Sequence, residues 1–152
     1  MATVQTHFGV YGVVIQESRL LTVRKARGPY TGLLDLPGGS PNPGETRDEA
    51  LIRELREETG GDPTQFGTWH RFEILVDRGS VGQPIEFRHR GEWRSVTLTD
   101  IHCGRPAFED VVDLEWIELS TWEDRDDLSA ALMSVLRALS GDLRGAPSSL
   151  HV

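Results

Sequence analysis

The sequence has a single cysteine, few aromatic residues and no long apolar run. Cys103 is the only cysteine in 152 residues, so no intramolecular disulfide can form, and we expect a reducing cytoplasm and a thiol that fills space instead of attacking a substrate. No segment reaches the length of a membrane span, and the first residues lack the basic and apolar regions of a secretion signal. We therefore predict a cytoplasmic protein with no membrane partner.

Positive charge is also scarce. Lysine and arginine total 16 against 24 aspartate and glutamate residues, giving a formal net charge of −8. A nucleic-acid-binding surface normally carries a basic footprint, so we predict no nucleic-acid partner. Hydrophobic residues make up 38% and charged residues 26%, which is typical of a globular chain with its own core. The length predicts a single domain over residues 1–140, followed by a flexible tail at 141–152.

Hydrophobic patterning predicts strands, one helix, several more strands and a closing helix. This order favours an α/β (α+β) fold, specifically an α/β/α sandwich with a mixed β-sheet. The closing helix is predicted over 126–139 because five apolar residues recur there at helical spacing: Leu128, Leu132, Val135, Leu136 and Leu139. The predicted strands cover 7–16, 20–23, 67–77, 84–90, 92–101 and 111–119, with a turn near Arg90-Gly91 between the fourth and fifth.

The first helix has clear start and stop signals. Thr46 is a suitable N-cap, and Glu49 three residues later completes a capping box. Gly60-Gly61 and Pro63 end the helix, which is therefore predicted over 47–59.

This helix carries three carboxylates close together. On a helical wheel Glu54, Glu57 and Glu58 occupy one arc, about 120° from the apolar arc of Leu51, Ile52 and Leu55. Like charges at these spacings destabilise a helix unless a cation lies beside them. Hard oxygen ligands without nearby cysteine or histidine suit Mg²⁺, with Mn²⁺ as a substitute. The alternative is a solvated acidic face paired with arginines of the same helix, of which Arg53 precedes Glu57 by four residues.

A glycine-containing loop precedes the helix. In Pro37-Gly38-Gly39 the missing Cβ atoms allow a ligand to approach the backbone closely, although a simple tight turn has the same composition. A glycine loop beside a divalent metal is typical of phosphate chemistry.

Residues 39–60 resemble the Nudix box of MutT-like hydrolases, Gly-x5-Glu-x7-Arg-Glu-U-x-Glu-Glu-x-Gly-U, where U is a bulky apolar residue. Only Gly61, at the last position, departs, and we expect looser packing after the helix there. Residues 9–23, the Leu36-Pro37-Gly38-Gly39 entry, residues 115–119 and the helix at 126–139 are similar to the rest of that fold. The matching residues are Gly39, Glu45, Arg53, Glu54, Leu55, Glu57, Glu58 and Gly60.

The resemblance implies Mg²⁺-dependent hydrolysis of a nucleoside diphosphate linked to a group X, yielding a nucleoside monophosphate and a phosphate-containing product. The metal ligands it implies are Glu54, Glu57, Glu58 and the Gly38 carbonyl, with Asp110 in support. Arg53 would orient the carboxylates, and Glu45 would support the loop. Bound cations would also screen the acidic protein from its anionic substrate. The general base stays open among four carboxylates: Glu57, Glu58, Glu109 and Asp110.

The residues that contact the substrate are harder to predict from the sequence. Arg24, Lys25 and Arg27 either hold a distal phosphate or form a solvated loop, and Gly39 would allow close approach. Aromatic residues at Phe8, Tyr30 and Trp69 either stack on a base or belong to the core, and Tyr30 is the strongest of these candidates. Neither His70, His89 nor His102 has metal-ligand spacing. The segment Glu92-Trp93-Arg94 is either a surface strand or part of a homodimer interface.

The sequence leaves the identity of the substrate open. The stretch after the box lacks the proline and the tyrosine that are typical of relatives acting on ADP-ribose and on dinucleoside polyphosphates, so nucleoside triphosphates, oxidised ones included, and nucleotide sugars remain. The alternative functions are a nucleotide-sensing domain without catalysis and an isomerase on the same fold, although all three box glutamates are kept.

Overall fold

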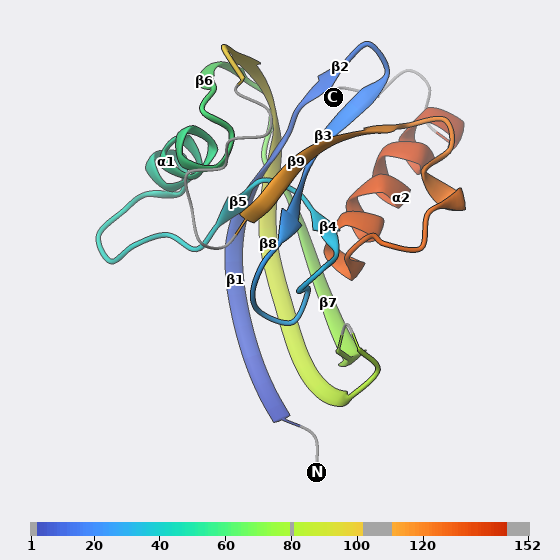
Figure 1. Ribbon diagram of the computed structural model, residues 1–152. Coiled ribbons are helices and arrows are strands. Elements are labelled where there is room, and N and C mark those ends of the chain that lie inside the picture. Colours follow the sequence, from blue (N-terminus) through green and yellow to red (C-terminus); the bar gives the residue numbers. More distant parts are fainter. Residues whose placement is uncertain (1–2, 80, 102–110, 146–152) are drawn as a thin grey trace.

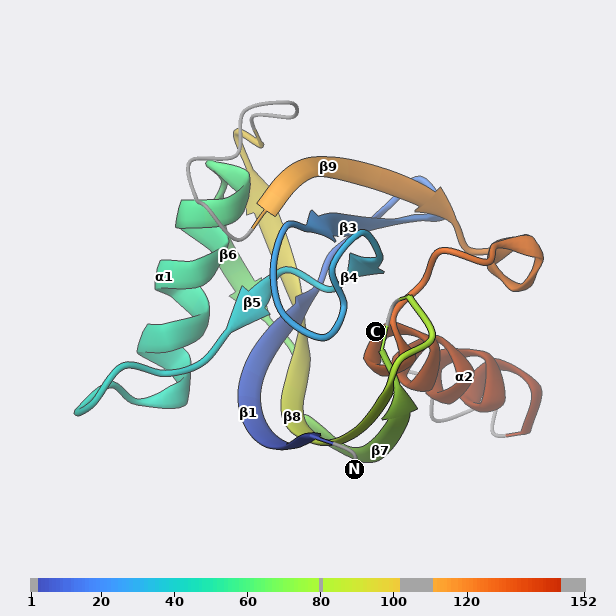
Figure 2. The same cartoon turned by 60° about the horizontal axis from the view of Figure 1, so that its bottom comes forward.

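The computed structural model describes residues 3–79, 81–101 and 111–145. Helix α1 (Arg47–Thr59) and helix α2 (Ala130–Gly145) lie on opposite sides of two β-sheets (Figure 1). A second view keeps the helices on opposite sides (Figure 2). The predicted layered α/β architecture with a mixed sheet is therefore confirmed. No helix in the described part of the chain is long and apolar enough to cross a bilayer.

The first sheet contains two long curved strands, β1 (Thr3–Val13) and β8 (Pro84–Thr99), which run parallel to each other. Their register places His7 opposite His89 and Gly9 opposite Gly91. All other pairings in this sheet are antiparallel: β5 (Gly38–Gly39) on β1, and β6 (Asp62–Phe66) and β7 (His70–Arg78) on β8. Because the parallel pair brings distant segments together, it forms the wall on which the functional site is built.

The second sheet is antiparallel and contains the predicted hairpin. Glu17 and Ser18 both adopt positive φ angles, 51° and 65°, and form the tight turn between its strands. A loop connects β3 (Arg19–Lys25) to β4 (Leu34–Asp35), and the glycine segment follows β4. The strands are β2 (Ile15–Gln16), β3 (Arg19–Lys25), β4 (Leu34–Asp35) and β9 (Val111–Glu118).

Helix α1 has the predicted bounds because its end signals are local. The Thr46 hydroxyl accepts a hydrogen bond from the Glu49 amide at 3.1 Å, and the Glu49 carboxylate accepts one from the Thr46 amide at 2.9 Å. Gly60 ends the helix in the left-handed region, with φ of 71°. The expectation of loose packing at Gly61 is wrong, because a Cβ there would lie 3.3 Å from Ile101 Cγ1 and 3.1 Å from the Thr99 carbonyl oxygen. Ile101 already fills that space.

Two predictions about the later strands are wrong. Residues 84–99 form one continuous strand without a turn at Arg90-Gly91, and the short strand β6 was not predicted. Gly91 is a glycine for steric reasons, because a Cβ there would overlap the ring of Phe72 on β7. In this position the glycine makes room for an aromatic ring and does not break the strand.

Helix α2 begins later and ends later than predicted, at residues 130 and 145 instead of 126 and 139. Ser129 precedes it and accepts a hydrogen bond from the Leu132 amide at 3.0 Å, as an N-cap does. The first five residues of the predicted tail, 141–145, are therefore helical, and residues 146–152 lie outside the described part. The predicted apolar stripe is buried in the core, with Leu132 fully inaccessible.

The core has two parts, one beneath each helix. Leu51 and Leu55 of α1 are fully buried against strand residues such as Val10. The stripe of α2 packs with Tyr11, Phe72 and other rings on the opposite face. Truncating one such leucine to alanine typically costs about 2–5 kcal/mol. The sheets are thus anchored on both sides, which fixes the wall formed by β1 and β8.

Candidate functional site

The helical wheel places the three carboxylates of α1 together in one arc away from the apolar face, but the structure separates Glu58 from the other two. Glu58 is buried, with 3% of its surface exposed, whereas the side chains of Glu54 and Glu57 are 15% and 27% exposed. The reason is spacing: Glu58 follows Leu51 by seven residues and Leu55 by three, so it shares their face. Ile52, placed on the apolar face by the wheel, is only half-buried. The acidic arc therefore continues into the buried side of the helix.

Arg53 holds the carboxylates around it. Its Nε and Nη2 atoms donate to both oxygens of Glu45, at 2.7 and 2.9 Å. Its Nη1 atom donates to Glu54 at 3.0 Å and to Glu57 at 3.1 Å. The arginine lowers the pKa of Glu45 to about 2 through these hydrogen bonds. Arg53 thus braces Glu57 as its spacing predicts, and the contacts of Glu45 fit a supporting position in the loop.

The glycine segment lies directly beneath the helix. The Gly38 amide donates a 2.8 Å hydrogen bond to Glu58 Oε1, and Gly38 has a φ of 145°. A methyl group at Gly38 would overlap the Val10 carbonyl oxygen, and one at Gly39 would lie 2.8 Å from Glu54 Oε1. The two glycines are therefore required for the helix and the strand β1 to approach each other.

Burial makes this region unfavourable for negative charge. Desolvation raises the pKa of Glu58 well above its usual range, opposed by Lys25 and reinforced by Glu54. Desolvation also raises the pKa of Glu54, opposed mainly by Arg53. Within the described residues, no three His, Cys, Asp or Glu side chains are gathered as a ready-made metal site. The donor chemistry nevertheless fits a hard divalent cation, since Glu54 and Glu57 already converge on one nitrogen of Arg53.

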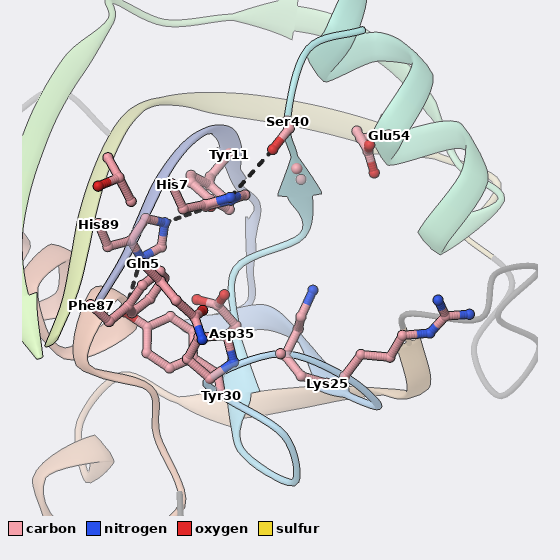
Figure 3. Close-up of a pocket in the computed structure, with 16 residues that line it drawn as sticks. Gln5, His7, Tyr11, Lys25, Tyr30, Asp35, Ser40, Glu54, Phe87 and His89 are labelled. Atoms are coloured by element: carbon pink, nitrogen blue, oxygen red, sulfur yellow. Dashed lines mark hydrogen bonds between the residues drawn. The ribbon is translucent and has the colours of Figure 1, made fainter. Parts of the chain in front are cut away.

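A cleft of about 390 Å³ opens beside this helix. One end contains Glu54, Gly38 and Gly39, and Lys25 projects between Asp35 and Glu54 (Figure 3). The opposite end is aromatic. The cleft is lined by Gln5, Thr6, His7, Tyr11, Lys25, Arg27, Gly28, Pro29, Tyr30, Asp35, Gly38, Gly39, Ser40, Glu54, Phe87 and His89. Acidic, cationic and aromatic side chains thus line the same cleft.

His89 forms the centre of the aromatic end. Its Nε2 atom lies 2.7 Å from the Tyr11 hydroxyl and its Nδ1 atom 2.9 Å from the Tyr30 hydroxyl. Burial lowers the pKa of His89 to about 3, with His7 and Lys25 adding to the effect. The imidazole is therefore neutral near pH 7. Sequence reasoning excluded His89 as a metal ligand and missed its place in the cleft.

Comparison with known proteins agrees with this geometry. The family model of the NUDIX domain matches residues 5–137. The chain belongs to the Nudix family. It is 31% identical over 121 residues to the 8-oxo-dGTP diphosphatase of Escherichia coli K12, covering 66% of this chain and 89% of that protein. The matched domain, together with relatives named diphosphatase and pyrophosphatase, indicates a hydrolase acting on phosphoric anhydride bonds.

A further relative and a solved structure are also similar over part of their lengths. The ADP-ribose pyrophosphatase of Methanocaldococcus jannaschii is 39% identical over 51 residues, 34% of this chain and 30% of that protein, so the chain spans under a third of that relative. A Francisella tularensis structure of a bifunctional NMN adenylyltransferase/ADP-ribose pyrophosphatase, complexed with AMP and a Mn ion, is 24% identical with a TM-score of 0.70. That match covers 90% of this chain and 42% of the other, and it shows the shared Nudix fold.

Several predicted residues lie away from the cleft of this Nudix domain. Arg24 instead donates hydrogen bonds to Glu115 at 2.8 Å and to Asp127 at 3.1 Å. Successive side chains of a strand point to opposite faces, so Arg24 lies on the face of β3 opposite to Lys25. Phe8 packs in the core under α1. Trp69 packs with the guanidinium groups of Arg47 and Arg94, whose Cζ atoms are 4.7 and 4.8 Å from its ring centroid. Of the three predicted aromatic residues, only Tyr30 lines the cleft.

The segment Glu92-Trp93-Arg94 is not a surface strand, since it lies in β8 between β1 and β7 and Trp93 is 4% exposed. The homodimer stays a prediction. His70 stacks on the ring of Trp93 at 4.3 Å between centroids. Four residues of the sequence analysis lie outside the described part of the chain: His102, Cys103, Glu109 and Asp110.

Proposed function

We propose that this Nudix hydrolase cleaves a nucleoside diphosphate linked to X in the presence of Mg²⁺, with nucleoside triphosphates as its substrates. The observation that carries the proposal is the set of groups that line one cleft: Glu54 of α1 at one end, Lys25 beside it, and the aromatic residues at the other end (Figure 3). A substrate with a heterocycle at one end and a polyphosphate at the other matches this arrangement.

Each part of the cleft has a chemical task in this proposal. Lys25 and Arg27 neutralise phosphate oxygens, and Tyr30 and Phe87 provide apolar surface for the base. The residues that would hold a divalent cation are Glu54, Glu57 and Glu58, with Gly38 beside them and Asp110 in support. When bound, the cation supplies charge neutralisation at the phosphoryl group and acidifies the attacking water. Arg53 keeps Glu54 and Glu57 oriented.

The relatives support this substrate class. The names of two relatives specify 8-oxo-dGTP and ADP-ribose, and the Francisella tularensis neighbour holds AMP and a Mn ion. The greater coverage of the 8-oxo-dGTP diphosphatase favours a triphosphate. A cytoplasmic location fits such a substrate.

A substrate panel tests the proposal. Purified protein is incubated with 8-oxo-dGTP, dGTP, CTP and ADP-ribose, with MgCl₂ or with EDTA, and the products are identified by mass. We expect a nucleoside monophosphate and pyrophosphate from at least one triphosphate, in the MgCl₂ arm only. Tight nucleotide binding without any product would instead indicate a sensor domain, and turnover of ADP-ribose alone would overturn the choice of triphosphates.

Glu58→Gln tests the role of the helix. Glutamine can still accept the hydrogen bond from the Gly38 amide but cannot carry a negative charge. We therefore expect turnover to fall by more than about 100-fold, which exceeds the loss expected from removing a residue that only supports a metal ligand. The melting temperature should not fall, because burial already disfavours the charged form. The matched control is Glu49→Gln on the same helix, which keeps the capping box and should leave turnover unchanged. Near-normal rates in Glu58→Gln would refute the metal-binding role.

A further inference from the structure

The first half of strand β1 has one edge on which no strand pairs. Strand β8 follows β1 along its whole length, from Thr3 to Val13, whereas β5 pairs with it only at Val10 and Tyr11. Within the part of the chain that the structure describes, no other strand joins the β5 side of β1. A strand edge left open exposes a row of backbone N–H and C=O groups that can pair with another molecule.

The ladder between β5 and β1 stops because of Pro41. The register that pairs Gly39 with Val10 would place Pro41 opposite Phe8. Proline has no N–H group, so it cannot complete that pair. The Ser40 hydroxyl donates a hydrogen bond to the Phe8 carbonyl oxygen instead, at 3.1 Å. Strand β5 therefore ends at Gly39, and the edge of β1 on the N-terminal side of Phe8 has no partner strand among the described residues.

Two contacts identify which backbone groups face this edge. The Phe8 carbonyl oxygen accepts from the residue after β5, and the Gly12 amide donates to the residue before β5 at 2.9 Å. Both residues thus turn their backbone groups to the β5 side, and the direction alternates from one residue to the next along a strand. Thr6 therefore also turns its N–H and C=O groups to the open edge, whereas Gln5 and His7 turn theirs to β8.

The open edge borders the cleft at Thr6. Side chains of a strand point alternately to its two faces, so those of Gln5 and His7 share one face and that of Thr6 lies on the other. All three residues nevertheless line the cleft, which therefore reaches the edge of the strand. This edge belongs to the aromatic end, because the centroid of the His7 ring is 5.1 Å from that of His89 and 6.3 Å from that of Phe87 (Figure 3). Backbone hydrogen-bonding groups and aromatic rings thus lie beside each other.

We propose that the open edge of β1 binds the base of the nucleotide through hydrogen bonds to the N–H and C=O groups of Thr6. This inference rests on the proposed function for the identity of the ligand. The rim of a nucleobase carries hydrogen-bond donors and acceptors beside each other, which complements a strand edge. Ionised phosphate oxygens are acceptors only and cannot satisfy the C=O group. The cations Lys25 and Arg27 serve that part of the substrate instead.

Amide hydrogen exchange tests the edge in the wild-type protein alone. The His7 amide donates to β8 and the Thr6 amide does not, so we expect a protection factor at His7 at least about tenfold above that at Thr6. Exchange is followed residue by residue by NMR on the full-length protein labelled with ¹⁵N. Equal protection of Thr6 without any ligand would overturn the proposal, because it would show an edge that is already paired, as in a dimer joined along β1.

Nucleoside monophosphates test the occupant of the edge. They contain no anhydride bond and are not consumed, so 8-oxo-dGMP, dGMP and CMP are each added at saturation with MgCl₂. We expect at least one of them to slow exchange at Thr6 by about tenfold or more. The matched control is 2-deoxyribose 5-phosphate, which has the sugar and the phosphate but no base and should leave exchange at Thr6 unchanged. No slowing by any monophosphate, or equal slowing by the sugar phosphate, would overturn the proposal.

Proline at position 6 tests the edge during turnover. Thr6→Pro removes the N–H group from the open edge without removing a hydrogen bond to β8, and strand edges tolerate proline. Thr6→Ala is the reference, because it has lost the same side chain but keeps the N–H group. Relative to it, we expect KM for the best triphosphate to be about threefold to tenfold higher in Thr6→Pro, with kcat within about twofold. Equal KM values in these two variants would overturn the assignment.

The control for proline itself is Val4→Pro. Val4 faces the same edge two residues earlier but does not line the cleft, so its variant should have the KM of the wild type. A rise in KM as large as that of Thr6→Pro would overturn the assignment, since it would report a distorted strand.

Failure of the proposed function gives a different result. Absence of turnover on every triphosphate refutes that function, whereas exchange at Thr6 is measured without turnover and judges the edge by itself. Turnover of a triphosphate combined with a Thr6 amide that no monophosphate protects would overturn only the role of the edge.

Discussion

Alanine at Gly38 should reduce stability and alanine at Gly39 should reduce turnover, although the residues are adjacent. At Gly38 the new methyl group would overlap the backbone oxygen of Val10, and φ is 145°, a region that residues with a Cβ rarely adopt. Backbone strain of this kind costs about 1–3 kcal/mol, and forced overlap about the same again. We therefore expect Gly38→Ala to lower the free energy of unfolding by about 2–6 kcal/mol.

At Gly39 the methyl group would meet a side chain instead. Its contact with Glu54 Oε1 would be 2.8 Å, whereas ordinary contacts begin at 3.4 Å, so the carboxylate must move by about 0.6 Å. A flexible side chain can do so at little cost to stability. Because displacements near 1 Å at a reacting centre can reduce rates by about 100-fold, we expect kcat to fall by about 10- to 100-fold.

Urea unfolding and steady-state turnover of the best triphosphate measure the two effects on the same preparations. Gly44→Ala is the control, since Gly44 also has positive φ but no atom within 4 Å of its Cβ position, so it reports backbone strain alone. Wild-type kcat in Gly39→Ala would refute the placement of Glu54 over this glycine. Stability of Gly38→Ala equal to that of Gly44→Ala would refute the overlap with Val10.

Two further predictions concern stability. Folding lowers the pKa of His89 from 6.5 to about 3. Between these two pH values, the imidazole is protonated in the unfolded chain and neutral in the folded protein. The stabilising contribution of the neutral His89 is therefore complete above pH 6.5 and falls by about 1.4 kcal/mol per pH unit below it. The difference in unfolding free energy between wild type and His89→Phe should consequently shrink from pH 6.5 to about 4.5. A constant difference would contradict the neutral imidazole. Gly61→Val, which introduces the apolar residue of the Nudix box, should lower the free energy of unfolding by about 1–3 kcal/mol. Adding Ile101→Ala should recover part of this loss, because it removes the side chain that the valine would meet. A Gly61→Val variant more stable than wild type would show that the space beside Gly61 is free.

The parts of the fold that the sequence predicts well depend on local signals. Helix α1 has its predicted bounds because Thr46, Glu49 and Gly60 act within one turn of its ends. The sequence predicts two strands in place of β8 because Gly91 resembles a turn residue. The role of Gly91 depends instead on Phe72, which belongs to another strand. Similarly, the start of α2 is set by Ser129, whose hydroxyl also donates to Asp35 on β4. Such tertiary partners are absent from local patterns.

The same distinction applies to the site. The glycine segment and the acidic helix are contiguous in sequence, so their proximity was predictable. His89 and Tyr11 are 78 residues apart and meet because β1 and β8 pair in parallel. The period of two in His7, Gly9 and Tyr11 and in Phe87, His89 and Gly91 is the available signal, but it does not specify which strands pair or in what register. Glu58 shows a different failure. The helical wheel assigns it to the acidic arc, although it follows Leu51 by seven residues and shares the buried face.

The separation of the cleft wall from the acidic helix has a consequence for how such an enzyme diversifies. The aromatic end is supplied by β1, β8 and the loop after β3, whereas the carboxylates belong to α1, and the glycine strand β5 connects the two regions through its contacts with both. Under the proposed function, substitutions at positions such as His7, Phe87 or His89 would change which molecule is admitted while the acidic helix keeps its geometry. Substrate selection and hydrolysis would then depend on separate segments of the chain.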